Sequence, residues 1–139
     1  MSTHKTPKVA KLIAHLKHDR YDSRYLGYFE CFNLQLHYEA HDVLEDLWLE
    51  TKGPLHNYYK GLIQLAGAFV HLKNSKLDPA ARLFRLCKKY LEPYPSDTEG
   101  MDMAELLSQI DLWIETLESS GYKKSPYDPK HPPTLQPKL

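Results

Sequence analysis

The chain has 139 residues with 18 basic and 18 acidic side chains, so its formal net charge is zero when the histidines are counted as neutral. This balance argues against a broad electrostatic attraction to nucleic acid or to an anionic membrane. The length fits one domain, because single domains most often have roughly 100–150 residues. No secretory signal is evident, and the longest charge-free apolar stretch, residues 61–70, is much shorter than the about 20 residues of a membrane-spanning helix.

Only two cysteines occur, Cys31 and Cys87, and each lies inside an apolar helical pattern. This placement is typical of reduced, buried thiols in a cytoplasmic protein. A single bridge between the two residues is the alternative.

Two helices are predicted at the start of the chain. In the first, apolar residues recur at helical spacing, at Val9, Leu12, Ile13 and Leu16. The second, over about residues 22–35, has one aromatic stripe made of Tyr21, Tyr25, Tyr28 and Phe32. We expect these rings to pack in the core or at an interface, with the hydroxyl groups bonded to water or to a partner.

The next two helices are predicted at about residues 38–51 and 54–73. Gly53 followed by Pro54 separates them, because glycine suits the left-handed end of a helix and proline suits the first turn of the next one. The second of the two is apolar nearly all round its middle, which is typical of the central helix of a bundle. Their short connection favours an antiparallel pair.

Two further helices complete the predicted fold. One begins at Asp78-Pro79 and ends before Pro93, and the other covers about residues 101–119. The fold class is therefore all-α: a compact multihelical bundle of about five helices, forming a single domain over residues 1–121. Residues 122–139 contain five prolines and few aliphatic residues, so we expect an extended Pro-rich tail, either loose or lying along the bundle.

The helix at about residues 38–51 has a polar flank beside its apolar face. Its apolar centre consists of Ala40, Val43, Leu44 and Leu47. Four of its five acidic residues are expected to lie well away from that centre: Glu39, Asp42, Asp46 and Glu50. His41, Glu45 and Trp48 follow one another at spacings of four and three residues, so they share one edge between core and solvent.

The helix at about residues 54–73 has a comparable edge, formed by Gln64 and His71. If the two helices are antiparallel, these polar edges face each other. The candidate site is then a semi-buried polar cluster, whose members are His41, Glu45, Trp48, Gln64 and His71. Burying such groups costs several kcal/mol unless each finds a partner.

Three interpretations of this cluster are open. In the first, the groups bond to one another and only set the register of the helices. In the second, His41, Glu45 and His71 bind a divalent metal with open coordination positions. In the third, the same groups act as general acids and bases beneath a small cleft. His37 and Glu39 are alternative ligands, but they are better interpreted as residues of the helix entry.

The cluster lies within a recognisable pattern. Phe32-Asn33, then "YEAHDVLEDLW" over residues 38–48, then "GLIQLAGAFVHL" over residues 61–72, resembles a prokaryotic family known as domain of unknown function 309. The resemblance covers about residues 25–95, and Asp42 stands where the family usually has glutamate. It implies a compact helical bundle in a small cytosolic protein, and it brings no established activity.

We therefore predict a binding or interaction module that has a semi-buried His/Glu/Gln cluster and receives a protein partner or a second copy of the chain. The alternative is a hydrolase-like enzyme that uses a divalent metal at His41, Glu45 and His71, so the pattern leaves open whether the protein is an enzyme. Nucleic-acid binding through the basic N-terminal helix and the lysines of the tail is the third possibility, and zero net charge disfavours it.

Overall fold

The computed structural model describes residues 7–139, and this range contains six α-helices and no strand. The helices are α1 (Pro7–Ile13), α2 (Ser23–Asn33), α3 (His37–Glu50), α4 (Leu55–Lys73), α5 (Leu77–Leu91) and α6 (Met103–Ser119), with one 3-10 turn, η1 (Thr98–Gly100), before α6. The all-α prediction is confirmed. The expected total of about five helices is corrected to six, although each of the six lies where the sequence pattern placed a helical segment. The first of them, α1, buries Val9 and Ile13 against Val43 of α3.

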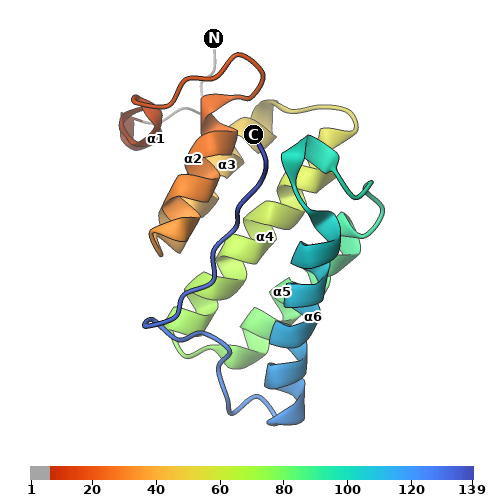
Figure 1. Ribbon diagram of the computed structural model, residues 1–139. Helices are drawn as coiled ribbons and strands as arrows, with labels where there is room; N and C mark the ends of the chain where they lie inside the picture. Colours follow the sequence, from red (N-terminus) through yellow and green to blue (C-terminus); the bar gives the residue numbers. More distant parts are fainter. Residues whose placement is uncertain (1–6) are drawn as a thin grey trace.

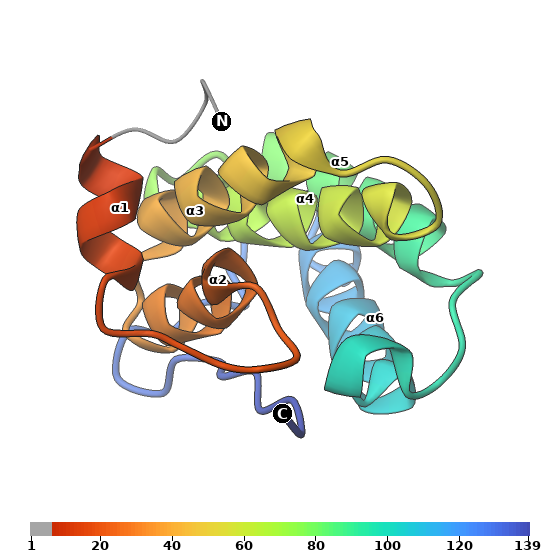
Figure 2. The ribbon, with the colours of Figure 1, turned by 90° about the horizontal axis from the view of Figure 1, so that it is seen from above.

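Helix α4 lies in the centre of the molecule, with α2 and α3 on one side and α5 and α6 on the other (Figure 1). Seen from above, α1 lies beside α2 and α3 at one end of the bundle (Figure 2). The central place of α4 follows from its composition, because a helix with apolar side chains on every face is stable only where protein surrounds it. Eleven of its 19 residues are buried, Leu62, Leu65 and Phe69 completely.

The aromatic stripe of α2 packs in the core, as predicted from its spacing. Tyr25, Tyr28 and Phe32 are at most 1% exposed. The hydroxyl group of Tyr28 donates to the carbonyl oxygen of Leu62 at 2.6 Å. A buried hydroxyl without a partner would destabilise the fold, so this bond both satisfies the tyrosine and ties α2 to α4.

Both cysteines are free and buried, which agrees with the prediction of reduced thiols. Burial raises the pKa of the Cys31 thiol to about 11, and it also raises the pKa of Cys87. None of the helices in residues 7–139 has the length and hydropathy needed to cross a bilayer.

Residues 122–139 form no helix or strand, and they return across α4 between α2 and α6 (Figure 1). Leu135 of this segment is only 4% exposed and belongs to the main hydrophobic core. The segment therefore lies along the bundle. The division into a domain over 1–121 and a separate tail stays a prediction.

Candidate functional site: the cleft between α3 and α4

Four of the five candidate residues line a single cleft, with a volume of about 350 Å³, between α3 and α4. They are His41 and Glu45 from α3 and Gln64 and His71 from α4. Tyr38, Lys60, Ile63, Gly67, Val70 and Leu83 complete its lining. We name this feature the α3–α4 cleft.

Trp48, the fifth candidate, does not line the cleft but lies where α3 meets the start of α4. Its ring is 4.9 Å from the ring of His56, and the Nζ atom of Lys60 lies 4.5 Å from the centre of the Trp48 ring. These contacts hold the end of α3 against the beginning of α4, so the two helices are antiparallel. The indole Nε1 atom of Trp48 is buried and has no hydrogen-bond partner in the range 7–139.

His41 and Glu45 lie on a half-buried flank, with 30% and 46% of their side chains exposed. The Nε2 atom of His41 is 3.8 Å from Oε2 of Glu45, which is too long for a hydrogen bond. The other ring nitrogen, Nδ1, lies 3.3 Å from Oδ1 of Asp42. Because neither contact of His41 is short, the imidazole of His41 and the carboxylate of Glu45 can still form hydrogen bonds with a molecule in the cleft.

Gln64 and His71 provide the polar groups of the α4 side. Gln64 is 9% exposed, and its Oε1 atom is buried with no hydrogen-bond partner among the residues that the structure describes. Burial lowers the pKa of His71, and the positive charges of Lys76 and Arg82 lower it further. The imidazole of His71 is therefore neutral at neutral pH, so that it can donate one hydrogen bond and accept another.

The rest of the cleft wall is largely apolar, with Ile63 and Val70 from α4 and Leu83 from α5. Gly67 contributes no side chain at the middle of this wall. A Cβ atom added there would lie 3.1 Å from Cδ1 of Leu83, so the glycine keeps the cleft open and lets α5 come close. An apolar wall with a few polar groups is typical of a ligand site in proteins.

The three candidate metal ligands line the cleft without being grouped for one ion in the described part of the chain. Although His41, Glu45 and His71 line the same cleft, residues 7–139 contain no group of three or more His, Cys, Asp and Glu side chains placed to hold a metal ion. We therefore develop no metal-dependent reaction for this site.

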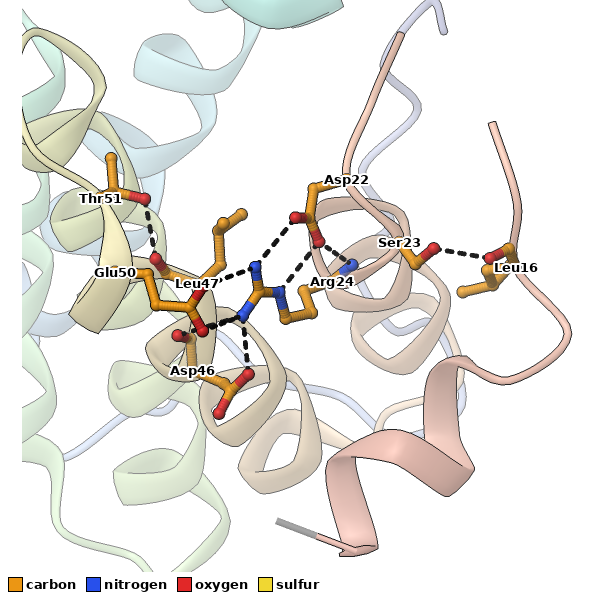
Figure 3. Close-up of polar contacts among 8 residues, drawn as sticks. All are labelled: Leu16, Asp22, Ser23, Arg24, Asp46, Leu47, Glu50 and Thr51. Atoms are coloured by element: carbon orange, nitrogen blue, oxygen red, sulfur yellow. Dashed lines mark hydrogen bonds and ion pairs between the residues drawn. The ribbon is translucent and has the colours of Figure 1, made fainter. Parts of the chain in front are cut away.

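A partly buried ion network between α2 and α3, in which Arg24 and Asp46 are buried, was not predicted from the sequence (Figure 3). The guanidinium of Arg24 donates to Oδ1 and Oδ2 of Asp22, both at 2.9 Å, to Oδ2 of Asp46 at 2.8 Å, and to Oε2 of Glu50 at 2.7 Å. The hydrogen bonds that Arg24 donates to Asp22 contribute most to raising the pKa of Arg24, followed by those to Glu50 and Asp46. Such a bidentate pair with additional carboxylates is a strong, directional anchor.

This network corrects the expected position of Asp46. The helical wheel placed Asp46 away from the apolar centre of α3, but the residue is only 3% exposed. Its charge is tolerated inside because Arg24 on another helix neutralises it, and a wheel drawn for one helix contains no information about that partner. In the sequence, the only indication that Asp46 is buried is its spacing of three residues from the apolar Val43, which places the two on neighbouring turns of one helix face.

A hollow of about 420 Å³ lies beside Arg24, and it is larger than the α3–α4 cleft. The nitrogen atoms of Arg24 are nevertheless all engaged by protein oxygens, so no donor remains to bind an anion there. We therefore regard this hollow as a consequence of the ion network and the α3–α4 cleft as the candidate site.

His37 is a second residue whose environment differs from expectation. It begins α3, as predicted for a helix-entry residue, but it is 1% exposed and neither ring nitrogen has a hydrogen-bond partner within residues 7–139. Its ring stacks on Phe69 at 5.0 Å and meets the edges or faces of Phe32 at 4.9 Å and Tyr127 at 5.8 Å. Burial in this aromatic cage, with a smaller effect from Lys73, lowers the pKa of His37 to about 4.

The segment that carries the cleft is similar to a known family. Residues 25–83 match the family model described as Domain of unknown function (DUF309). The match covers 59 of the 139 residues, and over this part the chain is similar to DUF309. Every residue that lines the α3–α4 cleft, from Tyr38 to Leu83, lies within the part matched to DUF309. The comparisons with curated proteins and with solved structures gave no match.

Proposed function

We propose that this protein is a binding module, and that its α3–α4 cleft receives an aromatic side chain of a partner protein that also carries an N–H or O–H donor. The observation that carries the proposal is Gln64, whose carbonyl oxygen is buried at the cleft without a hydrogen-bond partner. An unpaired buried acceptor costs about 1–3 kcal/mol, and a donor from a bound group would recover part of that free energy. The proposal requires the terminal amide of Gln64 to rotate on binding, so that its buried oxygen faces the cleft.

The other walls favour the same class of group. Ile63, Val70 and Leu83 offer an apolar surface that suits a ring, and Gly67 leaves room for it. Tyrosine and tryptophan combine a large apolar surface with one polar atom, and these residues are enriched among the strongest contacts of protein interfaces. The two free, buried thiols support a reducing compartment such as the cytosol.

The test uses three small probes that present one side chain each: N-acetyl-tryptophanamide, N-acetyl-tyrosinamide and N-acetyl-phenylalaninamide. Each is titrated into the ¹⁵N-labelled full chain while the backbone amide signal of Gly67 and the side-chain amide signals of Gln64 are followed. We expect saturable shifts with the tryptophan and tyrosine probes and weaker binding of the phenylalanine probe, because phenylalanine has no donor for Gln64.

The variant Gln64→Leu removes the acceptor but keeps a side chain of similar size. In this variant the preference for tyrosine over phenylalanine should disappear. Gln109→Leu on α6 is the matched control, because Gln109 lies outside the cleft, and it should keep the preference. Absence of saturable shifts for all three probes, or an unchanged preference in Gln64→Leu, would contradict the proposal.

A further inference from the structure

The C-terminal segment, residues 122–139, occupies a groove that is separate from the α3–α4 cleft. The segment crosses α4 and lies between the end of α2 and the start of α6 (Figures 1 and 2). We name this surface the tail groove and define it by the residues that bond to the segment or line a hollow with it: Asn33 at the end of α2, Gln35 after α2, Gly100 in η1, and Met101 and Leu106 near the start of α6.

Asn33 recognises the backbone of the segment. Its Nδ2 atom donates to the carbonyl oxygen of Leu135 at 2.9 Å, and its Oδ1 atom accepts from the backbone N–H of Leu135 at 2.8 Å. One amide thus satisfies both backbone groups of one residue, as a neighbouring β-strand would do. This type of contact requires an extended peptide but no particular side chain.

A sequence preference comes from Leu135, and a second backbone contact fixes the end of the segment. The side chain of Leu135 is 4% exposed and lies in the main hydrophobic core. Three residues later, the backbone N–H of Lys138 donates to the carbonyl oxygen of Gly100 at 2.7 Å. A Cβ atom at position 100 would lie only 2.4 Å from the carbonyl oxygen of Lys138, so Gly100 is required for this close approach.

The charge of the groove and the space left beside the segment also indicate which kind of ligand it would bind. Hollows of about 270 Å³ and 320 Å³ adjoin the segment where it passes Met101, so the segment does not fill the groove. Asp97, Asp102 and Glu105 line these hollows, and the exposed Lys138 of the segment borders one of them. Prolines at 132, 133 and 137 favour an extended backbone around Leu135, which reduces the entropy lost on docking.

We propose that the tail groove is a receptor for extended, basic, proline-containing peptides with a leucine at the position of Leu135, and that the chain's own tail is its intramolecular occupant. A partner protein that presents such a peptide displaces the tail. Asn33 lies inside the range matched to DUF309, whereas the tail lies outside it. Asn33 and the tail segment that it binds thus come from different parts of the chain.

The experiment uses a fluorescein-labelled peptide with the sequence of residues 126–139 and measures its anisotropy with the full-length chain. The wild-type chain should bind the peptide weakly, because the attached tail competes at a high effective concentration. Leu135→Asp in the full-length chain weakens the attached tail, and it should increase the affinity for the peptide about tenfold or more. Leu112→Asp is the matched control, since Leu112 is 64% exposed on α6 and does not touch the tail groove.

Two further changes test the recognition itself. Asn33→Asp, added to Leu135→Asp, removes the donor to the peptide carbonyl at nearly constant size and should abolish the gain in affinity. A peptide that itself carries Leu135→Asp should not bind any of the chains. If Leu135→Asp does not fold, Lys138→Glu replaces it, because Lys138 is exposed and its reversal weakens the tail only through Asp97 and Asp102.

The proposal is wrong if the folded variants bind the peptide no better than the wild-type chain, or if Asn33→Asp leaves the affinity unchanged. A wild-type dimer in size-exclusion chromatography that the peptide dissociates would also overturn it. That result would assign the groove to the tail of a second copy of the chain.

Discussion

The buried imidazole of His37 should make the stability of the protein depend on pH. Its pKa is about 4 in the folded chain, against an ordinary value of 6.5, because the aromatic cage of Phe32, Phe69 and Tyr127 excludes water and Lys73 adds a positive charge nearby. The folded state therefore keeps His37 neutral where the unfolded chain takes up a proton. The contribution is fully present above pH 6.5 and is lost as the pH falls toward 4.

The magnitude follows from the two pKa values. Their difference of about 2.5 corresponds to about 3.4 kcal/mol in total, and the part lost between pH 8 and pH 5 is about 2 kcal/mol. The assay is urea unfolding followed by tryptophan fluorescence at several pH values from 8 to 5. Measurements stop at pH 5 because carboxylates begin to dominate the proton uptake below it.

His37→Phe keeps an aromatic ring in the cage and removes the titrating group. The variant should lose about 2 kcal/mol of the pH-dependent change between pH 8 and pH 5, whatever uniform effect the larger ring has on packing. His131→Phe is the control, because the His131 side chain is 85% exposed, and it should keep the wild-type pH dependence. If His37→Phe and the wild type show the same slope, the reasoning about the buried imidazole is refuted.

Two other predictions concern stability at neutral pH. Arg24→Met leaves three carboxylates of the α2–α3 network without their common partner, so it should lower the free energy of unfolding by about 3–5 kcal/mol. The control Arg85→Met breaks an exposed ion pair and should lower it by less than about 1 kcal/mol. Equal losses from the two variants in urea unfolding would disprove the special role of the buried network. Gly61→Ala should lower the free energy of unfolding by about 1–3 kcal/mol, because the new Cβ atom would lie 2.8 Å from the side chain of the buried Leu91. Gly67→Ala should change it by no more than about 1 kcal/mol. A melting temperature lowered equally by both alanines would argue against this difference in packing.

Much of the helical architecture was predictable from local spacing. The apolar positions Ala40, Val43, Leu44 and Leu47 of α3 are all buried, and the aromatic stripe of α2 lies in the core. Helical periodicity is a property of the backbone within one segment, so a sequence pattern reports it directly. The same argument placed His41 and Glu45 together on a flank of α3, because residues four positions apart are neighbours on any helix.

The burial of Asp46 and His37 was not predictable in this way. The charge of Asp46 is accommodated by Arg24, 22 positions earlier, and His37 is covered by Tyr127, 90 positions later. Neither partner shares a periodic pattern with its target. The environment of a side chain at the edge of a helix depends on which other segment packs there, and that choice is made by the whole fold.

The sequence by itself determined which stretches are helical, which face of each helix is apolar, and which polar residues border those faces. Only the tertiary structure decided that Gln64 and His71 lie across from His41 and Glu45, that Trp48 ends outside their cleft, and that the tail closes over Asn33. The physical reason is the range of the forces involved. Hydrogen bonding and side-chain spacing within a helix act over about four residues, whereas helix register results from the packing of side chains far apart in the chain.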